Sequence, residues 1–297
     1  MKSNNKSRLM LTASMAIFGT LAPFVRNIAV TSGELAFYRA VLAATIIILF
    51  MTATKQKIPF RDIRKELPLL ILSGAGMGVN WILLFEAYKY TTVSVATLSY
   101  YFAPVIVTAV SPFLFKEKLT KKQLICFAMS TLGIVLITGI GDISGGSSHI
   151  TGIMFALGAA VLYASVVLVN KFIRNVDGIH RTLLQFLSAI VVLIPYVIAT
   201  SGITLANLDA KGWICLLVIG IVHTGLAYCM YFTALKDVSG QQAAILSYID
   251  PLVAVLISVT LLGESMNVMQ ITGGALILGF TLWNELPQKN KEYEKND

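Results

Sequence analysis

Long apolar runs dominate the pattern of hydrophobic and polar positions along the chain. A helix that crosses the hydrocarbon core of a membrane needs about 20 mostly apolar residues. Charge clusters and turn-forming residues divide the chain into ten such runs, at residues 9–30, 34–53, 67–88, 92–115, 122–141, 150–172, 180–201, 212–235, 239–262 and 266–285. The pattern therefore predicts an all-α integral membrane protein with ten transmembrane helices.

Composition supports the membrane class. Of the 297 residues, 56% are hydrophobic and only 13% are charged, against about 25% charged residues in soluble domains. The three cysteines, Cys126, Cys215 and Cys229, lie inside apolar runs without metal-ligand spacing. The sequence contains no clustered catalytic set, metal motif or phosphate-binding loop. We therefore expect neither an enzyme nor a bound cofactor, and we expect transport to draw on a gradient.

The net charge of +8 reflects basic residues in the short loops between the apolar runs. This placement is typical of topology signals and not of nucleic-acid contacts. With the N-terminus inside, nineteen Lys and Arg residues fall on the inner side and three on the outer side. The bias predicts that both termini are cytoplasmic.

The chain also repeats itself at a constant offset of 147 residues. Residues 81–136 match residues 228–283, and the matched pairs include Phe85 and Phe232, Tyr101 and Tyr248, Pro104 and Pro251, Glu117 and Glu264, and Gln123 and Gln270. We expect two repeats, 1–144 and 145–297, with five helices each. Because five is odd, the repeats are inverted relative to each other, as in alternating-access carriers that bind substrate where the halves meet.

Four motifs accompany this organisation. They are Phe18-Gly19 with Pro23 in the first run, Glu34-Leu-Ala-Phe-Tyr-Arg39 in the second, Ala96…Pro104…Glu117-Lys-Leu-Thr, and Ser247-Tyr-Ile-Asp250-Pro251…Gly263-Glu264. With them the chain resembles the drug/metabolite transporter superfamily, and specifically its EamA-type exporters. The resemblance implies a central cavity lined by helices 1, 3, 4, 6, 8 and 9. It also implies export of small metabolites such as amino acids across the bacterial inner membrane.

Two charged residues within the apolar runs are candidates for function, since a charged side chain at the bilayer centre costs about 2.5–3.5 kcal/mol. Asp250 lies midway along the run 239–262, directly before Pro251, and is a candidate proton carrier. The alternative is an acid that hydrogen-bonds neighbouring Ser or Tyr side chains. Arg39 could attract a substrate carboxylate, or it could pair with Glu34 five residues earlier.

The remaining polar and proline residues of the motifs receive structural or gating roles. Glu117 and Glu264 close their runs as interfacial acids, and Pro23, Pro104 and Pro251 are expected to interrupt helical hydrogen bonding. For His223, a hydrogen-bonded structural role is favoured over proton handling, and Glu86 is favoured as an interfacial acid.

Aromatic and polar side chains near the middle of the runs form the candidate substrate site. A phenol at that depth needs a polar partner or a watery cavity. The candidates are Phe18, Asn80, Trp81, Tyr100, Tyr101, Tyr163, Tyr228, Tyr231, Ser247 and Tyr248. For any one of these residues core packing is the favoured interpretation, and for the group as a whole core packing and cavity lining are equally favoured.

We therefore expect a proton-coupled exporter of a small molecule that works by alternating access within the lipid bilayer. An uncoupled facilitator or channel is the alternative, because channels also contain repeats. The sequence does not separate import from export, and it does not determine the oligomeric state.

Overall fold

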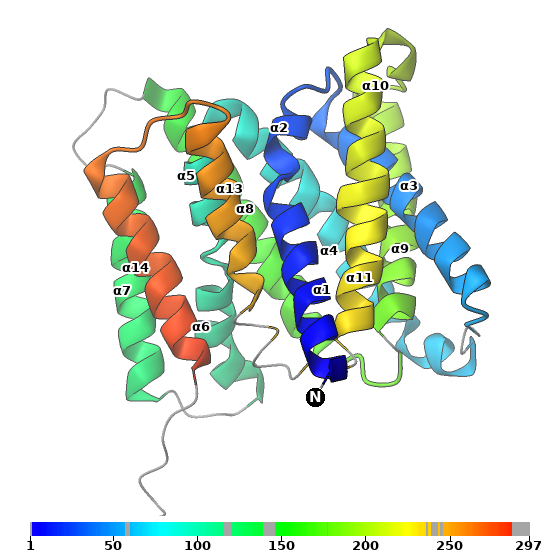
Figure 1. The fold of residues 1–297 in the computed structure, drawn as a ribbon, viewed down its shortest axis with the longest axis horizontal. Coiled ribbons are helices and arrows are strands. Elements are labelled where there is room, and N and C mark those ends of the chain that lie inside the picture. Colours follow the sequence, from blue (N-terminus) through cyan, green and yellow to red (C-terminus); the bar gives the residue numbers. More distant parts are fainter. Residues whose placement is uncertain are drawn as a thin grey trace, which may run out of the picture.

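The computed structural model describes residues 2–56, 60–115, 120–138, 146–176, 178–235, 237–238, 243 and 246–286. Within these residues the chain is helical and contains no strand (Figure 1). The helices are α1 (Lys2–Gly19), α2 (Leu21–Val25), α3 (Ser32–Ala53), α4 (Phe60–Tyr90), α5 (Val93–Tyr100), α6 (Ala103–Phe115), α7 (Lys121–Thr138), α8 (Gly146–Asn170), α9 (Gly178–Thr200), the 3-10 turn η2 (Leu205–Asn207), α10 (Ala210–Leu217), the π-helix η3 (Val218–Leu226), α11 (Ala227–Ala234), α13 (Ile249–Thr260) and α14 (Val268–Glu285).

Each predicted run overlaps helices in the described part of the chain, although the structure divides several of them. Seven stretches are long and apolar enough to cross a membrane: Asn5–Val25, Ser32–Ala53, Ile63–Tyr90, Val93–Ser111, Ser148–Asn170, Gly178–Thr200 and Ala210–Ala234. The helix Ile249–Thr260 is apolar but shorter. The prediction of an all-helical membrane protein is thus confirmed, whereas the count of ten spans and the cytoplasmic termini stay predictions.

Side chains define several helix starts. Thr31 caps α3 in a capping box with Glu34, and Asn267 caps α14 in a second one with Gln270. These reciprocal bonds satisfy backbone donors that have no partner within the helix. Asp209 caps α10 by accepting a hydrogen bond from the backbone of Gly212 at 2.7 Å.

The two halves of the chain are interleaved. The long helix α4 packs against α8 and α9, α3 packs against α9 and η3, and α7 packs against α14 (Figure 1). Helix α1 lies against α11 and α13. Helices of the first half therefore pair mainly with helices of the second half, and the space between them is shared by both.

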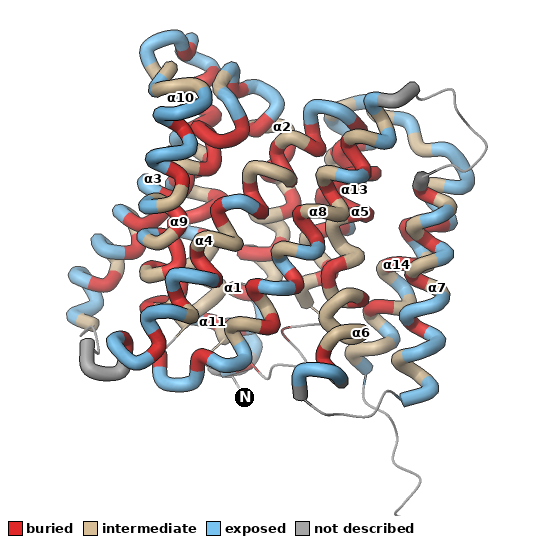
Figure 2. The backbone as a smooth tube through the Cα atoms, turned by 180° about the vertical axis from the view of Figure 1, so that it is seen from behind, coloured by how far each residue is buried: buried red, intermediate tan, exposed pale blue. Residues whose placement is uncertain are grey.

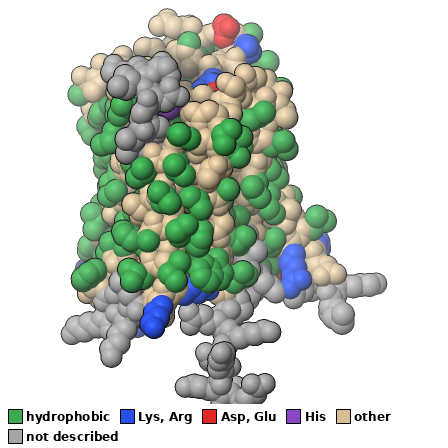
Figure 3. Space-filling model, turned by 90° about the vertical axis from the view of Figure 1, so that its left-hand side faces the viewer, with side chains coloured by type: hydrophobic (Ala, Val, Ile, Leu, Met, Phe, Trp, Pro, Cys, Tyr) green, Lys and Arg blue, Asp and Glu red, His purple; other side chains and the backbone are tan. Residues whose placement is uncertain are grey.

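The outer surface is apolar. Figure 2 shows exposed residues along the outward sides of the helices and buried residues on the inward sides. Val191 and Ile198 on α9 are 69% and 66% exposed. Figure 3 shows hydrophobic side chains over one side of the molecule and Lys and Arg side chains at its lower edge. Such a band is what a helix bundle presents to lipid.

Two helices break at positions related by the repeat. Helix α5 ends at Tyr100, and α6 begins at Ala103 with Pro104 as its second residue. Helix α13 begins at Ile249, directly after a turn at Tyr248. Asp250 therefore lies in the first turn of a helix, beside a turn within the run 239–262, and its place midway along a membrane span stays a prediction. Proline suits the first helical turn because its missing N–H is not needed there.

Candidate functional site

A cavity of about 700 Å³ lies between the two halves. Its walls come from α1, α2, α3, α4, α5, α6, α8, α9, α11 and α13. The helices expected to line it contribute, and so do α3 and α9, through Arg39, Phe50, Thr182 and Gln185. The site is therefore composite, because neither half encloses it alone.

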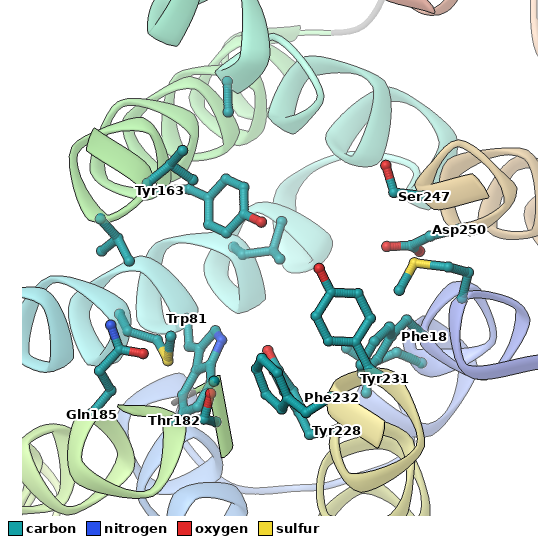
Figure 4. Close-up of a pocket in the computed structure, with 18 of the residues that line it drawn as sticks. Phe18, Trp81, Tyr163, Thr182, Gln185, Tyr228, Tyr231, Phe232, Ser247 and Asp250 are labelled. Atoms are coloured by element: carbon teal, nitrogen blue, oxygen red, sulfur yellow. The ribbon is translucent and has the colours of Figure 1, made fainter. Parts of the chain in front are cut away.

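Most of the predicted site residues meet at this cavity. Figure 4 shows aromatic rings from α4, α8 and α11 around one space, with Asp250 and Ser247 at its edge. The predicted residues that line it are Phe18, Arg39, Trp81, Tyr100, Tyr101, Pro104, Tyr163, Tyr228, Tyr231, Ser247 and Asp250.

Other predicted residues do not line the cavity. Asn80 is only 2% exposed, and its amide donates to the carbonyl oxygen of Ala159 at 2.6 Å. One residue turns a helix by 100°, so Trp81 faces the cavity while Asn80 contacts α8. Tyr248, at the turn before α13, is 7% exposed and also lies outside the lining.

Three of the motif residues with expected structural or gating roles lie away from the lining, whereas Pro104 is part of it. Pro23, Pro251 and Glu264 are absent from the cavity wall. Glu117 lies outside the described residues.

Asp250 is held by a tyrosine of the opposite half. The Tyr101 hydroxyl donates to Oδ2 of Asp250 at 2.8 Å. Tyr101 stands at the break after α5 and Asp250 stands at the start of α13, so the two helix breaks meet across the cavity. The hydrogen bond restrains one carboxylate oxygen, and the side chain still lines the cavity.

Arg39 projects from α3 and is only 5% exposed. Its Nε donates to Oγ1 of Thr224 at 2.7 Å, and its guanidinium lies 4.6 Å from the ring centre of Trp81. A cation over an indole face is attracted by the ring quadrupole. The structure therefore holds the guanidinium over the Trp81 ring at the cavity wall.

The alternative pairing of Arg39 with Glu34 is wrong. The carboxylate of Glu34 instead accepts hydrogen bonds from Thr31, Tyr38 and Thr204, and its residue is fully buried. Five helical residues turn the chain by about 140° beyond a full circle. Glu34 and Arg39 therefore face different neighbours.

A π-helix presents Thr224 to Arg39. Over Val218–Leu226 the hydrogen-bond pattern widens, and the Thr224 hydroxyl donates to the carbonyl oxygen of Ile219 at 2.9 Å. In the same stretch, Nε2 of His223 is hydrogen-bonded to Oγ1 of Thr20 at 2.9 Å, where α1 gives way to α2. His223 is 2% exposed and lies outside the cavity lining, in keeping with a structural role.

Aromatic rings in mutual contact form part of the wall. Phe18 and Tyr228 lie 5.0 Å apart edge to face, and Tyr100 and Tyr163 lie 5.5 Å apart. Phe186 sits behind this wall, 5.4 Å from Trp81 and 5.3 Å from Tyr228. These contacts stabilise an apolar face whose phenols supply polar edges.

Sequence reasoning missed several lining residues. Met77, Tyr88, Thr97, Thr182 and Phe232 belong to the wall. Gln185 also lines the cavity and donates to Ser73 and Asn170 at 2.8 and 2.7 Å. It is a polar residue within the apolar run 180–201, and that is the signal that could have identified it.

The cavity extends toward one end of the molecule. Phe50, Gln56, Asn170, Gly178 and Leu235 line this end, near the ends of helices on the side where the N-terminus lies (Figure 1). In the opposite direction the lining stops near Leu21, Ala22, Tyr88 and Thr97.

An ion pair lies beyond the other end of the cavity. Arg26 pairs with Glu264 and also donates to the carbonyl oxygens of Tyr88 and Thr91 at 3.3 and 3.0 Å. Glu264 in turn accepts from the backbone of Val93 at 2.8 Å and from the hydroxyl of Ser258. These bonds join α2, α4 and α5 of the first half to the chain around α13, and we call them the outer cluster.

The lining of the cavity has the chemical character of a small-molecule site. In the part of the chain that the structure describes, no group of His, Cys, Asp and Glu is placed to hold a metal ion. The cavity instead combines a buried guanidinium, a carboxylate and aromatic rings, which is typical of ligand pockets.

Comparison with known proteins places the chain among transporters. The model of the "EamA-like transporter family" matches it twice, at residues 5–139 and 150–284. The uncharacterized transporter YxxF of Bacillus subtilis is 28% identical over 93% of this chain and 88% of its own. A probable amino-acid metabolite efflux pump of Salmonella typhimurium is 26% identical over 72% of this chain and 76% of its own. A crystal structure with a TM-score of 0.65 and 18% identity, covering 93% of this chain and 96% of its own, shares the fold.

Proposed function

Because the chain belongs to the EamA-like transporter family, we propose that it is a secondary transporter that exports small metabolites by alternating access. The expected substrate class is amino acids, and this expectation is supported by the name of the Salmonella relative, a probable amino-acid metabolite efflux pump. The names of the family and its relatives are those of transporters and not of enzymes. The chain is a multi-pass membrane protein, which in bacteria means the inner membrane.

The cavity is the observation that carries the proposal. It is built from both halves and extends toward the N-terminal side of the molecule, while the outer cluster joins the halves on the other side. With cytoplasmic termini, as the loop charges predict, and ten spans, as the apolar runs predict, this is an inward-facing state. Movement of one half against the other would break the outer cluster and expose the same cavity outside.

Asp250 is the proposed site of proton coupling. It is the acidic residue among the described residues that line the cavity, and Tyr101 of the other half holds it. A carboxylate that gains a proton on one side and loses it on the other would link export to proton entry. The hydrogen bond between the halves also couples the state of this carboxyl to their relative position.

The test uses proteoliposomes loaded with labelled amino acids, including aromatic and small neutral members. We expect selective efflux that an opposing pH gradient accelerates several-fold. Asp250→Asn should abolish the acceleration, whereas Glu86→Gln, which changes an acid paired with Lys89 and away from the lining, should retain it. Efflux indifferent to the gradient would favour the uncoupled facilitator, and no efflux of any member would remove the amino-acid assignment.

A further inference from the structure

Opposite charges line the same cavity. Among the described residues, its charged lining consists of Arg39, Arg181 and Asp250. Arg181 donates to the carbonyl oxygens of Ile173 and Val176 at 2.9 and 3.1 Å, so it ties the α8–α9 loop at the end of the cavity. Arg39 and Asp250 belong to the deeper part, where the helix break, the π-helix and the aromatic wall meet.

Arg39 keeps hydrogen-bonding capacity for a ligand. Within the described residues, its guanidinium donates through Nε to Thr224, and neither terminal nitrogen donates a hydrogen bond to the protein. Trp81 and Phe85 cover the guanidinium with their rings, at 4.6 and 5.7 Å from the ring centres. Two parallel N–H groups thus remain available, and this is the geometry that binds a carboxylate in bidentate fashion.

Asp250 also keeps hydrogen-bonding capacity for a ligand, because one of its two carboxylate oxygens has no hydrogen-bond donor among the described residues. Tyr101 donates to Oδ2, and Oδ1 accepts no hydrogen bond from the described residues. The side chain is partly exposed to the cavity, beside Tyr231 and Ser247 in Figure 4. The open oxygen is an acceptor for an ammonium group.

The two charges interact electrostatically, yet in the described part of the chain they form no ion pair with each other. Burying opposite charges apart is costly unless each finds a partner. We propose that Arg39 and Asp250 are the two poles of a subsite for a zwitterion, whose carboxylate binds Arg39 and whose ammonium group binds Asp250.

The aromatic wall completes this subsite. Phe18, Trp81 and Tyr228 offer ring surface beside the two poles, and an ammonium group near aromatic faces gains further attraction. This inference rests on the proposed function, since it names the charge state of the molecule that the transporter carries.

The first test measures ligand binding to the purified full-length protein by calorimetry, independently of transport. L-Phenylalanine is the α-amino-acid zwitterion, and 6-aminohexanoate is a zwitterion with well-separated charges. 3-Phenylpropionate lacks the amino group, and 2-phenylethylamine lacks the carboxylate. We expect at least one zwitterion to bind about tenfold or more tightly than both single-charge analogues, because each missing charge forfeits a charge-assisted hydrogen bond. The zwitterion that binds more tightly shows which separation of the two charges fits the subsite.

The second test assigns the poles. Arg39→Gln should weaken the binding of 3-phenylpropionate and leave that of 2-phenylethylamine unchanged. Asp250→Asn should weaken the binding of 2-phenylethylamine and leave that of 3-phenylpropionate unchanged. Arg39→Lys keeps a cation and should recover part of the carboxylate affinity. Arg64→Gln, which changes an exposed arginine, and Glu86→Gln are the matched controls and should bind all four ligands as the unmodified protein does.

The outcomes separate this inference from the proposed function. If phenylalanine is exported but the single-charge analogues bind as tightly as either zwitterion, the zwitterion subsite is wrong and the transporter stands. Binding of neither zwitterion also overturns the subsite. If both variants lost the same affinity for both single-charge analogues, Arg39 and Asp250 would act by maintaining the shape of the cavity and not as opposite poles.

Discussion

At the scale of single residues, Glu34 shows how a motif acid can serve the scaffold. Its carboxylate joins the start of α3 to Thr204, in the segment between α9 and α10, and to the Tyr38 hydroxyl on its own helix. Arg39 follows in the same motif, and its side chain lines the cavity. Two residues of one short motif therefore have different tasks, and their neighbours decide which.

Replacing Glu34 by Gln should destabilise the protein. The amide keeps the shape but loses the charge and puts an NH₂ group where one carboxylate oxygen accepts hydrogen bonds. The expected loss is on the order of 1–3 kcal/mol, the cost of leaving buried polar groups unsatisfied. Thermal unfolding in detergent measures it, with Glu86→Gln as the control. Equal melting temperatures for the two variants would contradict this role of Glu34.

At the scale of elements, irregular helices shape the site. The break between α5 and α6 and the start of α13 bring Tyr101 to Asp250, and the π-helix η3 brings Thr224 to Arg39. Departures from regular helix are tolerated in membranes where they line a cavity or are buried in protein. Here they place polar side chains at the cavity.

Helix α1 approaches α13 closely at Gly19. A Cβ atom there would lie 2.5 Å from the carbonyl oxygen of Asp250 and 2.7 Å from Cβ of Val253. Gly19→Ala should therefore displace α13, disturb the bond from Tyr101 to Asp250 and lower the efflux rate several-fold. Gly279→Ala on α14 is the matched control, because a Cβ there meets no atom within 4 Å. Equal rates for both variants would show that the close packing is dispensable.

At the scale of the whole molecule, the two ends of the bundle differ. The cavity reaches the side where the N-terminus lies, and the outer cluster joins the halves on the other side. A second ion pair, between Lys89 and Glu86, lies on α4 near Arg26's backbone partner Tyr88, but Lys89 is exposed, Glu86 is half-buried, and the two are close in sequence. Exposed pairs contribute little to stability, so the outer cluster is the better candidate for holding the halves together.

Breaking the outer cluster should shift the protein toward the outward-facing state. In a protein whose three buried cysteines are replaced by serine, a cysteine at Thr97 reports access to the cavity. Glu264→Gln should raise its labelling rate by an impermeant thiol reagent added outside. Adding Arg26→Gln should raise it little further, because the pair is already broken.

The ion pair between Lys89 and Glu86 provides the control for this experiment. Glu86→Gln combined with Lys89→Gln should leave the labelling rate unchanged, since neither residue joins the halves. A similar increase in labelling for this control would contradict a specific role of the outer cluster.

The positions of the helices could be predicted from the sequence, and so could most of the candidate site. Apolar runs predict the helices because a helix in contact with lipid needs apolar side chains. Aromatic residues near the middle of these runs, such as Tyr163 and Tyr228, line the cavity. The exceptions have local causes. Asn80 turns toward α8 and not toward the cavity. Asp250 lies in the first turn of α13, where Pro251 is tolerated, after a turn at Tyr248 that the apolar run did not indicate.

The membrane class, the helix positions, the repeat and the family follow from the amino-acid sequence, because they depend on the hydrophobicity and spacing of neighbouring residues. Packing in three dimensions is needed to establish which face of each helix turns inward, since lipid is as apolar as a protein core and both faces are hydrophobic. It also decided the partners of Arg39, Asp250 and Glu264. The bonds of Arg39 with Thr224, of Asp250 with Tyr101 and of Glu264 with Val93 join residues 149–185 positions apart in the chain, so they exist only once the halves interleave.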